Sequence, residues 1–167
     1  MADNGGVDAD RHVHGSPDAP VTVVEYGDFE CPFCGAAAPV LRSLVDGSGG
    51  RVRLVFRHFP LFDVHPFALT AGLAAEASGE HFWEMHDLLF AHQDHLSDPD
   101  LAAYAARVGA GDVVGDAAQP FRTAIAADYA MGGAAGVRGT PTLFVGAVLY
   151  TGRVELLALR TATGLTR

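Results

Sequence analysis

The chain contains few or no residues of several types, and each of these shortages excludes some classes of function. Only two of its 167 residues are cysteines, too few for a disulfide framework, and the loop between them is too short to brace a fold. Lysine is absent, and the 11 arginines are scattered. Because phosphate binding needs clustered positive charge, a chain with a formal net charge of -9 is a poor partner for nucleic acids and anionic membranes.

Long apolar runs are also lacking. No segment approaches the roughly 20 apolar residues of a membrane-spanning helix. Residues 1–20 are polar and lack the charged start and apolar segment of a secretory signal. We therefore expect a cytoplasmic protein, or one from which a leader was removed. The 49% hydrophobic content is enough to bury a core without disulfides, and the length suits one domain with an insertion.

The first third of the chain alternates strand and helix patterns. Residues 21–26 are nearly all apolar, which is typical of a central strand covered on both faces. Residues 33–45 predict a helix, kinked at Pro39, and residues 52–59 predict a second strand. A strand, a long helix and a strand predict a parallel pair joined by a right-handed crossover. Residues 11–15 could add a short edge strand.

The middle of the chain, residues 66–131, carries no strand signal and predicts several helices. A β-hairpin turning at Gly146 and a final helix over residues 154–161 follow, with leucines 156, 157 and 159 expected to be buried. We therefore predict an α/β fold with a continuous helical insertion. The predicted parts are a flexible N-terminus over residues 1–15, a main domain over residues 16–65 and 132–167, and a helical subdomain over residues 66–131.

Both cysteines stand at the predicted start of the first helix, in the motif Cys31-Pro32-Phe33-Cys34. At a helix N-terminus the Cys31 thiolate would face unpaired backbone N–H groups, which lower a thiol pKa into the range of about 3.5–7.5. Cys34, three residues on, could attack a mixed disulfide formed at Cys31. The alternatives are a buried thiol pair or two zinc ligands, but zinc would need further ligands and no other cysteine exists.

Two further groups of ionisable residues need an interpretation. Glu25 interrupts the apolar first strand, so it is either a buried working acid or a side chain that faces water on an edge strand. Of the eight histidines, four gather around one predicted helix, at positions 81, 86, 92 and 95. No carboxylate or cysteine completes a convincing ligand set there. We interpret them as surface or core residues and predict neither a metal nor a cofactor.

The whole pattern, βαβ, helical insertion and ββα with Cys-x-x-Cys at the first helix, resembles the thioredoxin fold, and specifically its DsbA-like branch. The stretches that carry the resemblance are residues 21–26, 28–34, 57–61, 82–90 and 139–142. The chain departs from the family in a short, Gly/Ala-rich segment between residues 109 and 139, and in a hairpin turn without Asn-Gly. The first departure bears on the shape of the insertion.

The resemblance implies a thiol–disulfide oxidoreductase that acts on protein or small-molecule thiols and is recycled by a redox partner. It places Glu25 beneath Cys34, where it would exchange a proton with that thiol. It also implies that the Pro32-Phe33 dipeptide tunes the potential. DsbA-type oxidants usually have a hydrogen-bonding His where this chain has Phe33, so we expect a moderate redox potential.

The resemblance also assigns the distant Thr140-Pro141 pair to the site. It implies that the peptide bond between them is cis and lies against the sulfurs, with Thr140 backbone groups pairing with an extended substrate. The alternative is an ordinary trans proline at the start of a strand.

Two other functions are compatible with the fold. A glutathione-linked isomerase or transferase usually lacks the second cysteine, so Cys34 argues against it. A non-catalytic binding module would be signalled by loss of either cysteine or of Pro141, and none is lost. We expect a monomer.

Overall fold

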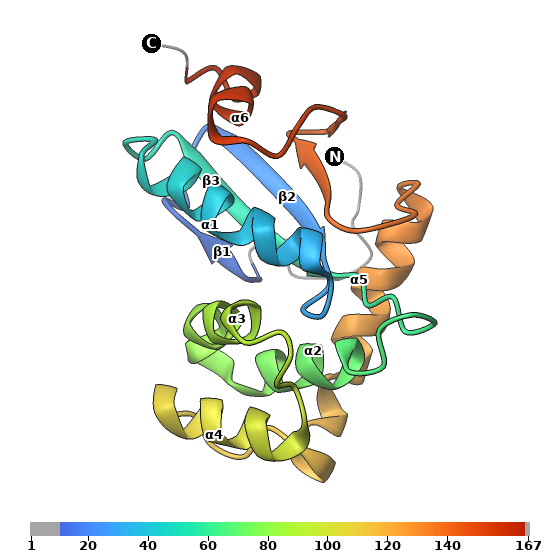
Figure 1. The fold of residues 1–167 in the computed structure, drawn as a ribbon. Coiled ribbons are helices and arrows are strands. Elements are labelled where there is room, and N and C mark those ends of the chain that lie inside the picture. The colour runs from blue at the N-terminus through green and yellow to red at the C-terminus, as the bar shows by residue number, and fades with distance from the viewer. Residues whose placement is uncertain (1–10, 166–167) are drawn as a thin grey trace.

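One mixed sheet of five strands forms the centre of the molecule, in the order β1-β3-β2-β4-β5 (Figure 1). The computed structural model of the chain describes residues 11–165. The central strand β2 is parallel to β3 and antiparallel to β4, while β1 and β5 are antiparallel to the outer sides of β3 and β4. The strands are β1 (Val13–His14), β2 (Val21–Gly27), β3 (Val52–His58), β4 (Thr142–Val145) and β5 (Val148–Tyr150).

Within residues 11–165, six α-helices accompany this sheet. Helices α1 and α6 lie together on one face, α5 packs against β3, and α2, α3 and α4 form a separate layer beyond one end of the sheet (Figure 1). The helices are α1 (Pro32–Asp46), α2 (Ala68–Ala77), α3 (Phe82–Ala91), α4 (Asp98–Val108), α5 (Arg122–Ala134) and α6 (Leu156–Ala162), with 3₁₀ turns at Gly79–His81, Gly115–Ala117 and Gln119–Phe121. The α/β class and the thioredoxin fold predicted from the sequence are confirmed.

The strand and helix patterns find their physical reason in two buried clusters. Val23, Leu54 and Leu143 of the sheet pack against Leu41 of α1 and Leu159 of α6. A second cluster joins the end of the sheet to the helical layer; among its members are Phe29, Phe56, Phe82, Met85, Leu89, Phe90, Leu101 and Tyr104. The loop that precedes α1 therefore lies at the junction of the two layers.

Between β3 and β4 the described structure contains helices and no strand, as the sequence indicates. Within this helical stretch, a 3₁₀ turn at Gly79–His81 leads directly into α3. The subdomain limits themselves stay a prediction. Of the N-terminus over residues 1–15 that was expected to be flexible, residues 1–10 fall outside the described residues, and Val13–His14 form the edge strand β1. No helix within residues 11–165 has both the length and the apolar character needed to cross a membrane.

The final helix corrects one expectation. Of the three leucines predicted to be buried, only Leu159 is; Leu156 is 40% exposed and Leu157 is 75% exposed. At 3.6 residues per turn, Leu157 and Leu159 point about 160° apart, so a short helix cannot bury both against α1.

Candidate functional site

The two cysteines lie at the start of α1, just after the loop that connects β2 to this helix. Cys31 is the N-cap residue of α1, with extended backbone angles, and Pro32 occupies the first helical position, where its missing N–H does no harm. The backbone N–H of Cys31 donates to the Asp28 carbonyl at 3.1 Å, which closes the turn before the helix. Both cysteines are reduced and buried, whereas Phe33 between them is 73% exposed.

The environment separates the acidities of the two thiols. A hydrogen bond with Cys34 lowers the pKa of Cys31 to about 5; burial opposes this, and contacts with Thr140 and with the backbone N–H groups of Cys34 and Phe33 support it. The same hydrogen bond, followed by burial, raises the pKa of Cys34 above its ordinary value. At neutral pH the site therefore presents one thiolate and one thiol, which is the arrangement that disulfide exchange needs.

Thr140 and Pro141 form the wall that faces Cys31. The peptide bond between them is cis. The Cys31 thiol lies 3.5 Å from the Thr140 carbonyl oxygen, to which it donates a hydrogen bond. The Thr140 hydroxyl is buried without a hydrogen-bond partner in the described structure, so it is available to donate to a thiolate. The structure thus brings together the two motifs that lie farthest apart in the sequence.

Glu25 is the buried acid of the site. It lies in β2, paired in register with Phe56 on one side and Leu143 on the other, and it is 0% exposed. Neither carboxyl oxygen has a hydrogen-bond partner in the described structure. Burial, with a smaller contribution from the negative charge of Cys31, raises the pKa of Glu25 to about 8. Its alternative position on a water-facing edge strand is wrong, because β2 is the central strand.

The Glu25 carboxylate also affects Cys34, because its negative charge contributes to the raised pKa of the Cys34 thiol. A carboxyl that titrates near neutrality, buried close to a thiol that must lose its proton, can accept that proton. The geometry is compatible with the proton exchange that the resemblance implied for Glu25.

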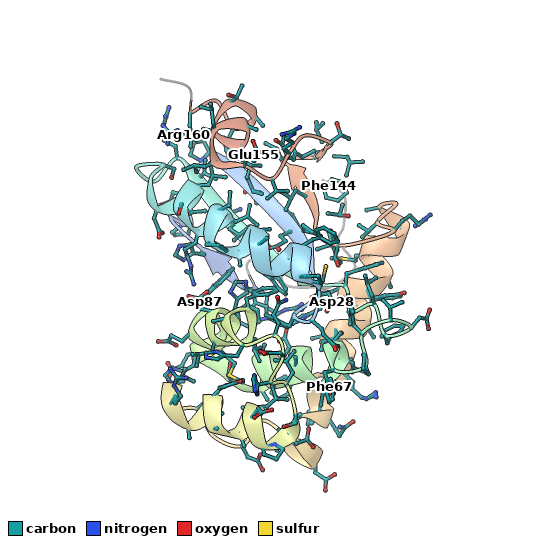
Figure 2. All side chains as sticks on the ribbon, viewed as in Figure 1. Asp28, Phe67, Asp87, Phe144, Glu155 and Arg160 are labelled. Carbon is teal, nitrogen blue, oxygen red and sulfur yellow. The ribbon has the colours of Figure 1, made fainter. Side chains whose placement is uncertain are left out.

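Asp28 and His65 are neighbours of the motif that the cysteine pattern alone does not reveal. The buried Asp28 carboxylate accepts hydrogen bonds from the backbone N–H of Glu30 at 2.7 Å and of Leu61 at 2.8 Å, and from His65 Nδ1 at 2.8 Å. Asp28 lies where the loop before α1 faces the helical layer (Figure 2). Although partial burial opposes protonation of His65, its bond to Asp28 and the charge of nearby Cys31 raise its pKa. A cationic imidazole beside the thiolate would stabilise it.

Gln93 holds the loop from the helical side. Its Nε2 donates to the carbonyls of Phe29 at 2.9 Å and Cys31 at 2.7 Å. A Cβ on Gly35 would come within 2.3 Å of the Gln93 side chain, so glycine at this position leaves room for the Gln93 amide where it makes these hydrogen bonds. The local sequence gives no sign of the contacts that His65 and Gln93 make, and Asp28 stands out only as a member of the stretch 28–34 that carries the family resemblance.

Several apolar side chains between β3 and α2 are exposed. Phe62 and Val64, from the loop after β3, are 50% and 68% exposed, and Phe67 is 45% exposed. The Glu30 carboxylate accepts a hydrogen bond from the backbone N–H of Phe67 at 2.7 Å, which ties this loop to the motif. Phe33, between the two cysteines, is a further exposed apolar side chain.

The comparisons with known proteins place the chain in a family. Residues 8–162 match the family described as Thioredoxin. The chain is 48% identical over 164 residues to the Na⁺/H⁺ antiporter NhaA 1 of Salinispora arenicola, and 50% identical over 163 residues to NhaA 3 of Salinispora tropica. Each match covers 93% of this chain and 25% of the relative. The chain thus spans about a quarter of the length of these curated relatives.

Solved structures agree on the fold. A thioredoxin-like oxidoreductase from Silicibacter pomeroyi superposes with a TM-score of 0.81 at 28% identity, covering 99% of this chain and 96% of that one. The thiol-disulfide exchange protein alpha-DsbA2 from Wolbachia pipientis gives a TM-score of 0.82 at 23% identity, covering 95% and 88%. The chain therefore belongs to the thioredoxin family, and its fold is that of the DsbA-like thiol–disulfide oxidoreductases.

Proposed function

We propose that the protein exchanges disulfides with protein or small-molecule thiols through Cys31 and Cys34. The observation that carries the proposal is the asymmetry of the pair: the pKa of Cys31 is lowered to about 5 while that of Cys34 is raised. In the reducing direction the Cys31 thiolate attacks a substrate disulfide and releases one substrate thiolate. Cys34 then loses its proton to Glu25 and attacks Cys31, which releases the second thiolate and leaves the Cys31–Cys34 disulfide.

In the oxidising direction the same steps run backwards. A substrate thiolate attacks Cys31, the Cys34 thiolate leaves and takes a proton, and a second substrate thiolate displaces Cys31. A redox partner that restores the starting form completes either cycle. The exposed Phe33 side chain suits unfolded or extended protein substrates, and we expect backbone groups of Thr140, which lies beside Cys31, to pair with them.

A moderate redox potential follows from the same residues. A Cys31 pKa of about 5 lies between the values of about 7 for thioredoxin and about 3.5 for DsbA. Phe33, which cannot donate a hydrogen bond to the thiolate, gives a physical reason. Equilibration with glutathione measures the potential. A value as oxidising as the −120 mV or so of DsbA would contradict this part of the proposal, and Phe33→His is expected to make the potential more oxidising.

Turnover is tested with insulin reduction and with oxidation of a dithiol peptide, using Cys31→Ser as the inactive control. Turnover that does not depend on Cys31 would contradict the proposal, and no turnover at all would favour a non-catalytic binding module. Glu25→Gln is expected to keep the fold and to slow the step in which Cys34 resolves the mixed disulfide. Unchanged kinetics in a stopped-flow measurement would remove Glu25 from the mechanism.

A second candidate function rests on the antiporter relatives. Because the matched region is a quarter of each relative, this thioredoxin domain accompanies a membrane antiporter in those proteins. We propose that a membrane transporter is one redox partner of this chain. Cys34→Ser should trap it as a mixed disulfide in membranes of the host, and the Cys31→Ser/Cys34→Ser double variant is the matched control. Trapping of other proteins only would contradict this candidate.

A further inference from the structure

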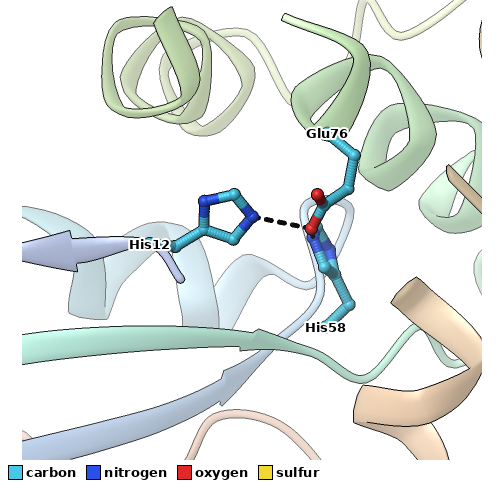
Figure 3. A group of neighbouring side chains, drawn as sticks. All are labelled: His12, His58 and Glu76. Carbon is cyan, nitrogen blue, oxygen red and sulfur yellow. Dashed lines mark hydrogen bonds and ion pairs between the residues drawn. The ribbon is translucent and has the colours of Figure 1, made fainter. Parts of the chain in front are cut away.

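A second cluster of metal-binding residue types lies outside the cysteine site, where the edge of the sheet meets the helical layer. His12 precedes β1, His58 ends β3, and Glu76 belongs to α2 (Figure 3). Both imidazole Nε2 atoms point at the same carboxylate oxygen, Glu76 Oε1, at 2.7 Å from His12 and 2.8 Å from His58. We propose that His12, His58 and Glu76 form a binding site for a divalent transition metal of the zinc type.

The donor set matches that metal. Two imidazole nitrogens and one carboxylate oxygen are a ligand set of zinc sites that keep a fourth position open. The three donor atoms already lie within 4.8 Å of one another. Zinc bonds of about 2.0–2.1 Å in tetrahedral geometry place neighbouring donors roughly 3.3 Å apart. The carboxylate oxygen would therefore have to withdraw from each nitrogen by about half an ångström, and the two nitrogens, which lie no more than 4.8 Å apart, would have to reach the same spacing through small side-chain rotations.

The fold holds the two histidines in place without an ion. His12 is the one residue other than glycine with a positive φ within residues 11–165, at 57°. Its ring stacks on Phe82, with centroids 3.5 Å apart and planes 11° apart. His58 packs edge-on against Phe56 and Phe82. Rings fixed by packing lose little freedom when they bind a metal, which favours binding.

The protonation state of the cluster suits a cation. Burial lowers the pKa of His12 despite its bond to Glu76, so this imidazole is neutral near pH 7 and has a lone pair to offer. Although burial opposes ionisation of Glu76, the hydrogen bonds from the two histidines lower its pKa and keep it ionised. Metal binding would shift the ring proton of each histidine to Nδ1.

The positive charge nearest the cluster is that of Arg11. Its Nε lies 3.4 Å from Glu76 Oε1 but makes no hydrogen bond within the described residues, while its Nη2 donates to the buried Asp128. The Nε of Arg57 also lies 3.8 Å from Asp128 Oδ1. The positive charge of Arg11 and Arg57 is therefore partly neutralised by Asp128. The side of Glu76 Oε1 that faces the two histidines interacts with their imidazole rings.

The site is separate from the cysteine pair, although Phe29 connects them. The Phe29 ring lies 6.0 Å from the His58 ring, centroid to centroid, and Phe29 precedes Cys31 by two residues. No ligand is shared, so the ion would bind equally to the oxidised protein. The histidines that lie close together along the chain gave no ligand set, so no metal was expected. The ligands of this site come instead from three segments that are distant in the sequence.

The test uses the full chain without a histidine tag, as the Cys31→Ser/Cys34→Ser variant so that thiols cannot bind the ion. Zn²⁺ is titrated in competition with a chromogenic chelator. We expect one equivalent to bind, and the affinity to fall by at least about tenfold in His12→Asn and in Glu76→Gln. Asparagine tolerates the positive φ of residue 12. His95→Asn, which removes a 65% exposed imidazole, is the matched control and should bind as before.

Thermal unfolding gives an independent readout. Because an ion that binds only the native state stabilises it, Zn²⁺ should raise the melting temperature of the parent variant and of His95→Asn, but not of His12→Asn. Circular dichroism identifies any variant that does not fold, and His12→Asn, at the sheet edge, carries the test if Glu76→Gln fails. A folded parent that binds no Zn²⁺, or His12→Asn binding as tightly as the parent, would overturn the proposal.

Discussion

Glu25 is a residue whose burial lowers the stability of the folded protein and whose presence has a functional reason. Its carboxyl is fully buried, its pKa is raised to about 8, and neither oxygen has a hydrogen-bond partner in the described structure. A buried, unpaired acid lowers stability, so its retention in a central strand needs a reason beyond packing. Proton exchange with Cys34 supplies one.

We predict that Glu25→Gln stabilises the protein, and more so at higher pH. The unfolded carboxyl loses its proton near pH 4.5 and the folded one near 8, so the native state binds more protons between these values and its stability falls as pH rises. The gain from Glu25→Gln should therefore be small near pH 5 and reach a few kcal/mol near pH 8. Urea unfolding at both pH values measures it.

The matched control for this prediction is Glu80→Gln, because the Glu80 side chain is 90% exposed. It should change stability little at either pH. A Glu25→Gln variant that is equally stabilised at both pH values would show that the carboxyl does not titrate where its burial suggests.

His65 offers a second prediction at this scale. Its imidazole is held by Asp28 and interacts with the charge of Cys31. His65→Gln removes a cation that favours the thiolate, so the pKa of Cys31 should rise by about 0.5–1 unit. The pH dependence of alkylation by iodoacetamide reports this pKa. His81→Gln is the matched control, and an unchanged alkylation profile in His65→Gln would exclude the imidazole from thiolate stabilisation.

Helix α5 is the element that joins the helical layer to the sheet. Its buried Asp128 accepts a hydrogen bond from the backbone N–H of His58 at 3.0 Å. Near its end, Gly132 lies against the rings of Tyr26 and Phe59, where a Cβ would come within 2.9 and 2.8 Å. The helix can approach β2 and β3 this closely only because residue 132 has no side chain.

Neighbouring glycines of α5 should therefore respond in opposite ways to alanine. Gly132→Ala forces the two rings apart and should lower the free energy of unfolding by about 1–3 kcal/mol. Gly133→Ala meets nothing within 4 Å and should raise it by about 0.5–1 kcal/mol, because alanine has the better helix propensity. Chemical denaturation measures both, and equal effects would contradict the close packing.

The elements also show what the sequence could and could not predict. Strand β2 and helix α1 could be predicted because the apolar residues within each segment are buried together, and this burial shows in the local sequence pattern. In α6 the pattern of three leucines predicts one buried face, but Leu157 lies on the opposite side of the helix from Leu159, and Leu156, at the first helical position, is 40% exposed. A short helix carries too few residues for its pattern to reveal its orientation.

For the whole molecule, the part of the site that lies within motifs was predictable and the part made by tertiary contact was not. The cysteines, Glu25 and Pro141 belong to stretches that resemble a family, and the structure brings them together. Gln93 reaches the motif from the helical subdomain, and His12, His58 and Glu76 converge from three elements. Their partners depend on how the layers dock, which local patterns do not encode.

The last prediction concerns the stability of the reduced protein as a whole. The Cys31 thiol ionises near pH 5 in the native state but near 9.0 in the unfolded chain. Between these values the unfolded state binds more protons, so this contribution to stability grows as pH rises and is lost as pH falls toward 5. Reduced protein should therefore gain stability relative to Cys31→Ser between about pH 5 and 8. Urea unfolding under reducing conditions measures this difference.

This difference links stability to redox chemistry. Whatever stabilises the reduced native state relative to the disulfide form also makes the protein a stronger oxidant. Phe33→His should therefore widen the pH-dependent gap and shift the potential in the oxidising direction together. If the gap between the parent and Cys31→Ser stayed constant with pH, the fold would not be stabilising the thiolate, and a potential above that of thioredoxin would need another cause.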